Sequence, residues 1–124
     1  MSDLAARMHS YFETYNSADA ERISAYYAPG VKLFASGGEI DGRVALLGVY
    51  REIINGFTDL MTPKRILTDD AVAMVEIEDM LTAKHDVKDF LGKPVKAGET
   101  VTLRLAGVYE FEDGLISRIT MYAL

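Results

Sequence analysis

The chain has 124 residues, 49% of them hydrophobic, and contains no cysteine and no tryptophan. This length suits a single domain with a substantial core, which we expect to span residues 1–124. The lack of cysteine excludes disulfides, thiolate metal sites and cysteine nucleophiles. A formal net charge of −6 argues against a nucleic-acid-binding surface, which needs clustered positive charge.

The sequence also gives expectations about location and cofactors. No segment approaches the roughly 18 consecutive apolar residues of a membrane span. The start Met1-Ser2-Asp3-Leu4 lacks the basic and apolar stretches of a signal peptide. We therefore expect a cytoplasmic protein that does not bind membranes. The two histidines, His9 and His85, are 76 positions apart, and we predict neither a metal site nor a cofactor.

The first third of the chain predicts two helices and a short strand. Apolar residues recur at helical spacing over 3–15, which indicates an amphipathic helix. A second, shorter helix is expected over about 18–27, with Ser17 as its N-cap and Pro29-Gly30 after its end. A short strand is expected over 31–35.

The rest of the chain predicts one more helix, followed by strands. The strongest helical periodicity in the sequence ends at Phe57, in a helix that we expect Asp41 to cap. Beyond it we expect strands at 64–68, 71–83, 100–112 and 115–123, a hairpin turn at Asp113-Gly114, and an irregular connection over 84–99. This order predicts an α+β fold: three N-terminal helices packed on the concave face of a curved, mostly antiparallel sheet, forming a cone with a pocket inside.

Asp79 is the acidic residue that the strand patterns single out. On the strand over 71–83, six of the seven odd-numbered residues are apolar and Asp79 is the seventh. Alternation on the three longest predicted strands leaves it as the one acidic residue clearly facing the pocket. A buried carboxyl needs hydrogen bonds or a raised pKa, and acid–base catalysis uses a raised pKa. The alternative is a bulge or a wet rim that exposes Asp79.

Tyrosines form a second group of candidates. Tyr11 and Tyr15 fall on the first predicted helix, Tyr26 and Tyr27 end the second, and Tyr50 is on the third. Several phenols that point into one cavity can donate hydrogen bonds to a ligand carbonyl or a developing oxyanion. Each tyrosine taken singly is also typical of the edge of a core.

His85 follows the long predicted strand directly and has two interpretations. It is either a solvated loop histidine or a proton carrier at the rim of the pocket near Asp79. His9 falls off the apolar face of the first helix, and we expect it on the surface.

Three stretches carry a resemblance to a known superfamily. They are Tyr11-Phe12-Glu13 through Tyr27-Ala28-Pro29-Gly30-Val31, Ile40-Asp41-Gly42-Arg43, and Phe90-Leu91-Gly92-Lys93-Pro94 to Phe111-Glu112-Asp113-Gly114-Leu115-Ile116. With the order of the elements, they resemble the nuclear transport factor 2-like superfamily, in its polyketide-cyclase-like and ketosteroid-isomerase-like branch. The resemblance covers nearly the whole chain and implies a cystatin-like cone. It specifies the fold more closely than the reaction, because the superfamily includes isomerases, cyclases, dehydratases, epoxide hydrolases and non-catalytic modules.

The ketosteroid isomerases give a partial match at their site residues. By resemblance, their oxyanion-hole tyrosine corresponds to Tyr11, and two supporting tyrosines correspond to Tyr27 and Tyr50. Their general base falls on Ala35 and their protonated oxyanion-hole aspartate on Gly107. Without these two carboxyls the resemblance does not imply steroid isomerisation by the known mechanism.

Limonene epoxide hydrolase gives a complementary partial match. By resemblance, one of its catalytic aspartates corresponds to Asp79. Its arginine falls on Ile77 and its second aspartate near Met121, so its triad is incomplete here. In the polyketide cyclases an acidic residue in the pocket serves as acid–base, and Asp79 is the residue that this resemblance implies for that role.

Two functions remain open on the sequence. In the first, Asp79 is a general acid or base on an apolar, cyclic substrate, with Tyr11 and Tyr50 orienting or polarising its oxygen, in an isomerase, cyclase or dehydratase (lyase) reaction. In the second, the chain is a non-catalytic ligand-binding or dimerisation module. Other residues expected to line the pocket are Tyr15, Tyr27, Leu33, Ala35, Phe57, Ile77, His85, Leu103, Leu105, Gly107, Ile119 and Met121.

The outward-facing strand residues predict a homodimer through the outer face of the sheet. Their apolar members are too numerous for open water: Val72, Met74, Met80, Ala106, Val108, Ile116 and Tyr122. The charged residues between them can pair across a two-fold axis: Arg104, Arg118, Glu76, Glu78 and Glu110.

Overall fold

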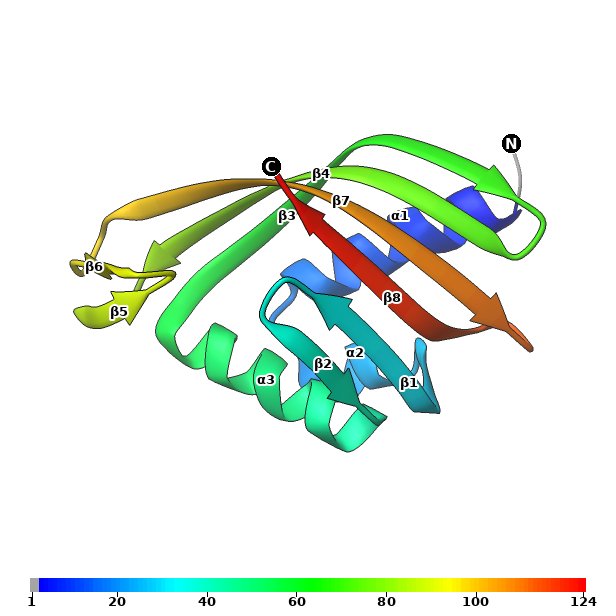
Figure 1. Cartoon of the computed structure of the whole chain (residues 1–124), viewed down its shortest axis with the longest axis horizontal. Helices are drawn as coiled ribbons and strands as arrows, with labels where there is room; N and C mark the ends of the chain where they lie inside the picture. Colours follow the sequence, from blue (N-terminus) through cyan, green and yellow to red (C-terminus); the bar gives the residue numbers. More distant parts are fainter. Residues whose placement is uncertain (1–2) are drawn as a thin grey trace.

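The computed structural model describes residues 3–124, and Met1 and Ser2 of the N-terminal segment considered above lie outside them. The expected α+β fold is confirmed: three helices pack on a curved, mostly antiparallel sheet (Figure 1). The helices are α1 (Asp3–Asn16), α2 (Ala20–Ser24) and α3 (Arg43–Gly56). In the described part of the chain, no helix is long and apolar enough to cross a membrane.

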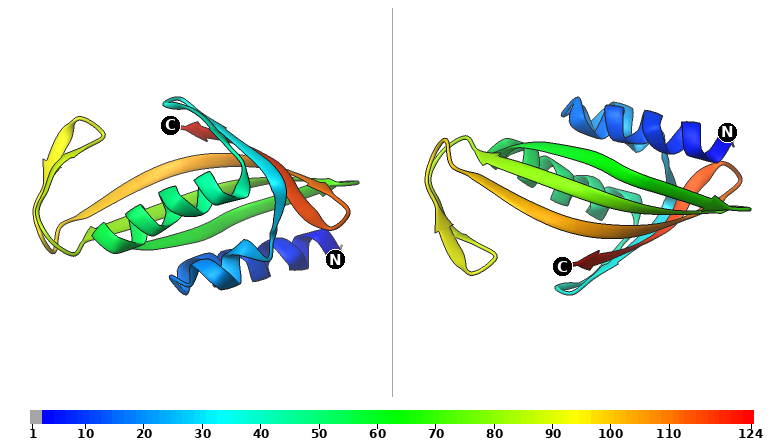
Figure 2. Two further views of the ribbon diagram at one scale, coloured as in Figure 1. Left: turned by 90° about the horizontal axis from the view of Figure 1, so that it is seen from below. Right: turned by 90° about the horizontal axis from the view of Figure 1, so that it is seen from above.

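Six strands form the main sheet, in the spatial order β2-β1-β8-β7-β4-β3. They are β1 (Tyr27–Ala35), β2 (Gly38–Asp41), β3 (Phe57–Asp69), β4 (Val72–Ala83), β7 (Thr100–Glu112) and β8 (Leu115–Ala123). β1 and β8 run parallel, and the other neighbours run antiparallel. Figure 2 shows α3 in front of the long strands from below and behind them from above. We call the face that the helices cover the inner face, and the opposite one the outer face.

The second helix is shorter than predicted and has a different cap. Asp19, not Ser17, is the N-cap, because its Oδ1 atom accepts hydrogen bonds from the backbone N–H groups of Glu21 and Arg22 at 3.1 and 3.2 Å. The helix ends before Tyr27, which is the first residue of β1. Tyr27 is therefore presented to the core by a strand.

The third helix begins without the predicted Asp41 cap. Asp41 is the last residue of β2, where it pairs with Lys32 of β1. Gly42 occupies the cap position instead, with a φ of 96° and no side chain to accept a hydrogen bond. The prediction was wrong because pairing of β2 with β1 holds Asp41 in the strand.

β3 is the largest departure from the predicted elements. A strand was predicted only at 64–68, whereas β3 has 13 residues and pairs with β4 along its length. α3 ends at Gly56, so helix and strand meet without a loop. At the start of β3, Phe57, Asp59 and Met61 are buried while the residues between them are exposed. This strand therefore adds side chains to the inner face that were not predicted to lie there.

The connection over 84–99 was expected to be irregular, but part of it forms a second, two-stranded sheet. Its strands are β5 (Val87–Phe90) and β6 (Lys93–Val95). The Phe90 ring packs against the Phe57 ring, with 4.8 Å between their centroids. The hairpin, yellow in Figure 1, thus extends the core beyond the ends of the long strands.

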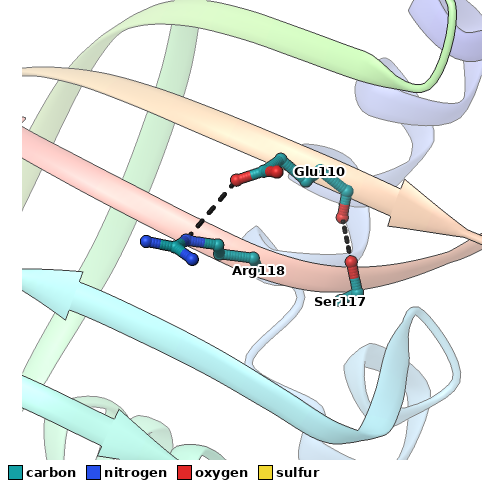
Figure 3. A network of polar contacts seen from close by, with 3 residues as sticks. All are labelled: Glu110, Ser117 and Arg118. Atoms are coloured by element: carbon teal, nitrogen blue, oxygen red, sulfur yellow. Dashed lines mark hydrogen bonds and ion pairs between the residues drawn. The ribbon is translucent and has the colours of Figure 1, made fainter.

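β8 departs from simple alternation at its start. A register shift places Glu110 opposite Arg118 but Phe111 opposite Ile116, so Ser117 is bulged. Ile116 is consequently fully buried instead of lying on the outer face, where we expected it. Arg118 forms an ion pair with Glu110 at 3.5 Å, and the Ser117 hydroxyl donates to the Glu110 backbone oxygen at 3.1 Å (Figure 3). These contacts hold β8 to β7 beside the bulge.

The core consists of two separate clusters of buried side chains. The larger cluster fills the space between the helices and the sheet, and includes Met61 on β3 and Ile77 on β4. The smaller cluster contains Phe57, Leu81 and Val95, the last from the hairpin. The boundary between the clusters therefore crosses β3 and β4 at one level of the sheet.

Candidate functional site

Two buried carboxyls, Asp59 on β3 and Asp79 on β4, lie at the boundary between the two core clusters. Asp59 is 5% exposed and Asp79 is 4% exposed. Asp79 is opposite Met61 in the ladder, and Asp59 is opposite Leu81. The two carboxyls are therefore diagonal neighbours on the inner face and within reach of each other. The inward position expected for Asp79 is confirmed, and the alternative of an exposed Asp79 is wrong.

This carboxyl pair has few hydrogen-bond partners. The Tyr15 hydroxyl donates to Oδ2 of Asp59 at 2.8 Å. Oδ1 of Asp59 and Oδ1 of Asp79 are both buried, and neither has a hydrogen-bond partner among the described residues. No lysine, arginine or histidine within residues 3–124 is buried, so no basic side chain is enclosed with the pair. Buried polar atoms without partners are uncommon and call for an explanation.

The pair holds a proton on Asp79. Burial, a side-chain hydrogen bond with Asp59 and the negative charge of Asp59 raise the pKa of Asp79 to about 9. At neutral pH Asp79 is therefore a neutral carboxylic acid beside a negatively charged carboxylate. Two neighbouring carboxyls of which one is protonated and the other ionised at the same pH are suited to act as acid and base in one reaction.

Tyr15 and Tyr50 support the pair rather than standing free for a ligand. Tyr15 donates its hydroxyl proton to Asp59, and its own backbone oxygen accepts a 2.6 Å hydrogen bond from the Tyr50 hydroxyl. Their rings pack edge to face with 4.9 Å between centroids. The Tyr50 donor is thus already used within the protein, which argues against the predicted role of polarising a substrate oxygen.

Tyr11 lies deeper, in a group of phenols with Tyr27 and Tyr109. The hydroxyls of Tyr11 and Tyr27 are 2.7 Å apart and share a hydrogen bond. The Tyr11 ring packs edge to face on Tyr109, and Tyr109 is 1% exposed. Burial raises the pKa of all three phenols, so they stay neutral. These contacts show Tyr11 engaged with other phenols, and a direct role for it on a substrate remains a prediction.

The remaining predicted site residues fall into groups by exposure. Buried ones are Tyr27, Phe57, Ile77, Gly107 and Ile119. Partly exposed ones on the inner face are Leu33, Leu103, Leu105 and Met121, each packed at the margin of a core cluster. Leu103 is directly opposite Asp79 in the β4–β7 ladder, so an incompletely covered apolar surface begins beside the carboxyl pair.

Three predicted residues offer little to a ligand at the pair. His85 is exposed, and its Nδ1 atom is 3.2 Å from the Asp86 backbone oxygen, as expected of a solvated loop histidine. Ala35 is exposed at the end of β1. At Gly107 an added Cβ would lie 2.7 Å from the Tyr109 ring. The space beside Gly107 is therefore occupied by a protein side chain.

Asp59 is the site residue that the sequence analysis missed. It lies just past the predicted helix, in a stretch not assigned to any strand. The available signal was the alternation of Phe57, Asp59 and Met61. Leu60 interrupts this alternation of apolar and polar residues, because it is a large apolar side chain on the opposite face, where it is 47% exposed. The conclusion that Asp79 is the one inward acidic residue was therefore wrong.

Two adjoining hollows lie on the outer face of the sheet. One of about 420 Å³ is lined by residues that include Lys64, Glu78, Arg104 and Tyr122. A second, of about 260 Å³, adjoins it at Tyr122 and includes Met74. Neither is lined by Asp59 or Asp79. Within residues 3–124 no group of three or more histidine, cysteine or acidic side chains is arranged to hold a metal ion.

A curved, mostly antiparallel sheet with three helices on its inner face is the fold of the nuclear transport factor 2-like class. More specifically, the family model of the SnoaL-like domain matches residues 8–119. The chain belongs to this family, which confirms the resemblance found in the sequence. A comparison with curated protein sequences finds no match.

Several solved structures share this fold. A candidate polyketide cyclase from Xanthomonas campestris pv. campestris has a TM-score of 0.81 and 21% identity, covering 95% of this chain and 87% of that one. A candidate ketosteroid isomerase from Kribbella flavida has a TM-score of 0.73 and 25% identity, with 96% and 76% covered. An LEH-like epoxide hydrolase from M. tuberculosis has a TM-score of 0.76 and 18% identity, with 94% and 79% covered. The activities in these names are those of the neighbours.

Proposed function

We propose that this protein binds an apolar, cyclic small molecule on the inner face of the sheet and carries out acid–base chemistry on it with the carboxyl pair. Asp79 is the general acid and Asp59 the general base. The observation that carries the proposal is the burial of both carboxyls side by side at the margin of an apolar core. Burying a charge in such surroundings is unfavourable, and proteins retain such groups chiefly where function requires them.

The proposed chemistry follows from the two protonation states. Asp79, protonated at neutral pH, donates its proton to an oxygen of the ligand as negative charge develops there. Asp59, held by the Tyr15 hydroxyl, accepts a proton from the ligand. The proton then returns to Asp79 through the side-chain hydrogen bond between the two carboxyls. Isomerase, cyclase and dehydratase reactions can each use an acid and a base paired in this way.

The apolar surface next to the pair supports an apolar ligand. Leu103 and Leu105 on β7, Met121 on β8 and Ile54 on α3 are each only partly buried. They pack at the margins of the two core clusters. A hydrophobic molecule that lies on them would bury the apolar surface still exposed on the inner face. The site would then distinguish ligands by their shape more than by their charge.

The test is a screen followed by one substitution. Small cyclic ketones, alcohols and epoxides are screened by NMR for binding and turnover. In Asp79→Asn we expect kcat to fall by about 10²–10⁴-fold with KM nearly unchanged, because the amide keeps the shape and loses the proton. Asp69→Asn, at the exposed end of β3, is the matched control and should keep full activity. Equal turnover by Asp79→Asn would contradict the proposal.

A non-catalytic binding module is the second candidate. It is favoured by the engagement of the Tyr11 and Tyr50 hydroxyls within the protein, and by Ala35 and Gly107 at the positions where the isomerase resemblance implies carboxyls. Under this alternative the wild-type protein binds members of the screen and converts none of them. Turnover that depends on Asp79 separates the two functions.

We also propose that two copies of the chain associate through their outer faces. Exposed apolar side chains gather there, including Leu67 (59% exposed), Met74 (54%) and Tyr122 (59%). Glu78 and Arg104 are directly opposite each other in the ladder, yet no ion pair joins them in the described residues. Around a two-fold axis each can meet the opposite charge of the partner copy.

A further inference from the structure

The carboxyl pair presents two polar atoms that the protein itself leaves without partners. Oδ1 of Asp59 and Oδ1 of Asp79 are buried and make no hydrogen bond with any described residue. The other Asp59 oxygen already accepts from Tyr15. A buried carboxyl oxygen without a partner is destabilising. The two atoms therefore indicate a position at which a polar group of a ligand supplies the missing hydrogen bonds.

The two atoms call for different hydrogen-bonding behaviour. Asp59 carries the negative charge of the pair and can only accept, whereas Asp79 carries the proton and can also donate. When the Asp79 proton turns from Asp59 to a bound ligand, a single group that donates to Asp59 and accepts from Asp79 satisfies both atoms. A hydroxyl has one donor and two acceptor lone pairs, whereas a carbonyl only accepts and an ammonium only donates.

The surroundings determine what kind of molecule carries that group. Met61 and Leu81 are directly opposite Asp79 and Asp59 on the paired strands. Leu103, opposite Asp79 on β7, is only partly buried. The pair is thus a polar spot between apolar side chains. No basic side chain is enclosed near it, so an acidic ligand group would meet the Asp59 charge without a counter-ion.

We propose that the ligand of this site is an alcohol on an otherwise apolar, cyclic skeleton, whose hydroxyl lies between Asp59 and Asp79, donating to the first and accepting from the second. This inference rests on the proposed binding of an apolar small molecule at the pair and names its chemical class. It also assigns Asp59, absent from the sequence-based site, as the residue that selects alcohols over ketones.

The test uses three probes with the same ring system: 1-tetralol, 1-tetralone and 1-aminotetralin. Binding to the full chain is followed by NMR at pH 7 through the methyl signals of Leu103 and Leu105. We expect 1-tetralol to bind about tenfold more tightly than 1-tetralone, because one added hydrogen bond to a charged carboxylate gives a difference of this size. Asp59→Asn should remove most of this difference by weakening 1-tetralol, while Asp69→Asn should leave it unchanged.

The outcomes separate this inference from the function on which it rests. If no probe shifts the inner-face signals, the binding of apolar ligands at the pair is wrong, and this inference fails with it. If 1-tetralol and 1-tetralone bind equally well, or if Asp59→Asn weakens both alike, the site binds apolar molecules but does not select a hydroxyl. The third possible result is that 1-aminotetralin binds best, with an affinity that increases about tenfold for each unit by which the pH rises toward 9, because its ammonium group displaces the Asp79 proton. In that case the site binds a cation, and the proposal of an alcohol is overturned.

Discussion

Asp59 and Asp79 lie one diagonal step apart on the inner face of two neighbouring antiparallel strands, with Asp79 opposite Met61. Both side chains are at most 5% exposed, and the proton that Asp79 retains keeps the pair at a single negative charge near neutral pH. Tyr15 fixes the Asp59 side of this arrangement through a 2.8 Å hydrogen bond. The proposed chemistry and the proposed ligand class both depend on this relationship.

Asp79 should make the protein less stable as the pH rises. Its pKa in the folded state, about 9, lies above the ordinary value of 3.8, so the folded state holds a proton that the unfolded state has lost between these pH values. The free energy of unfolding therefore falls from about pH 4 to about pH 9 through this group. Asp79→Asn should be more stable than wild type at pH 7, by on the order of 1–3 kcal/mol.

Urea unfolding at several pH values measures this effect. The advantage of Asp79→Asn should vanish near pH 4, where the carboxyl is protonated in both states. Asp69→Asn, on the exposed end of the neighbouring strand, should follow the wild-type profile throughout. A substituted protein that loses stability at pH 7 would show that Asp79 is not a protonated, buried group.

Tyr15→Phe should weaken the fold by removing the donor to Asp59. The substitution leaves Oδ2 of Asp59 buried without its hydrogen bond, a loss of about 1–3 kcal/mol. Ser36→Ala is the control, because it removes a hydroxyl from an exposed residue in the turn between β1 and β2, and its change should stay within about 0.5 kcal/mol. Equal unfolding midpoints in urea for the two variants would mean that the Tyr15–Asp59 bond contributes no stability.

Gly107→Ala and Gly48→Ala should shift stability in opposite directions. A Cβ at residue 107 would lie 2.7 Å from the ring of Tyr109, which is buried against Tyr11 and Phe12 and has no room to move. Overpacking of this kind destabilises by about 1–3 kcal/mol. A Cβ at residue 48, on the exposed side of α3, meets nothing within 4 Å. It should stabilise the helix by about 0.5–1 kcal/mol. Thermal unfolding of the two variants measures both effects. A Gly107→Ala variant with unchanged stability would indicate free space beside Tyr109.

Met74→Asp should break the proposed dimer. Met74, the third residue of β4, lies on the outer face and is 54% exposed, so a charge there would be buried without a partner on association. Val44→Asp places the same charge on α3, at a side chain that is 86% exposed, and should leave association unchanged. Sedimentation of the wild type at micromolar concentration should give a dimer, and a wild-type monomer would contradict the proposal.

Strand alternation allowed Asp79 to be placed from the sequence. On β4 twelve residues alternate with little interruption, so the inward face is unambiguous. The same argument failed on β8, because the bulge at Ser117 lets both Ile116 and Ile119 face the core. Periodicity predicts faces only where the ladder keeps its register.

Asp59 could not be found in this way, because local patterns near it conflict. The apolar stripe of the third helix runs on to Phe57, and Leu60 puts a large apolar residue on the outer face. Neither a helical nor a strand period prevails there, and only pairing with β4 over its whole length decides the outcome. The partnership of the two carboxyls is therefore a product of tertiary structure.

A carbon-13 NMR titration of the aspartate carboxyls tests the central claim most directly. With ¹³C-labelled aspartate, the Asp79 signal is assigned by its loss in Asp79→Asn. We predict that it keeps the chemical shift of a protonated carboxyl at pH 7 and titrates near pH 9. In Asp59→Asn the midpoint should fall but stay above 3.8, because burial, the largest cause of the raised pKa, remains. A wild-type Asp79 signal that titrates near pH 4 would contradict the account.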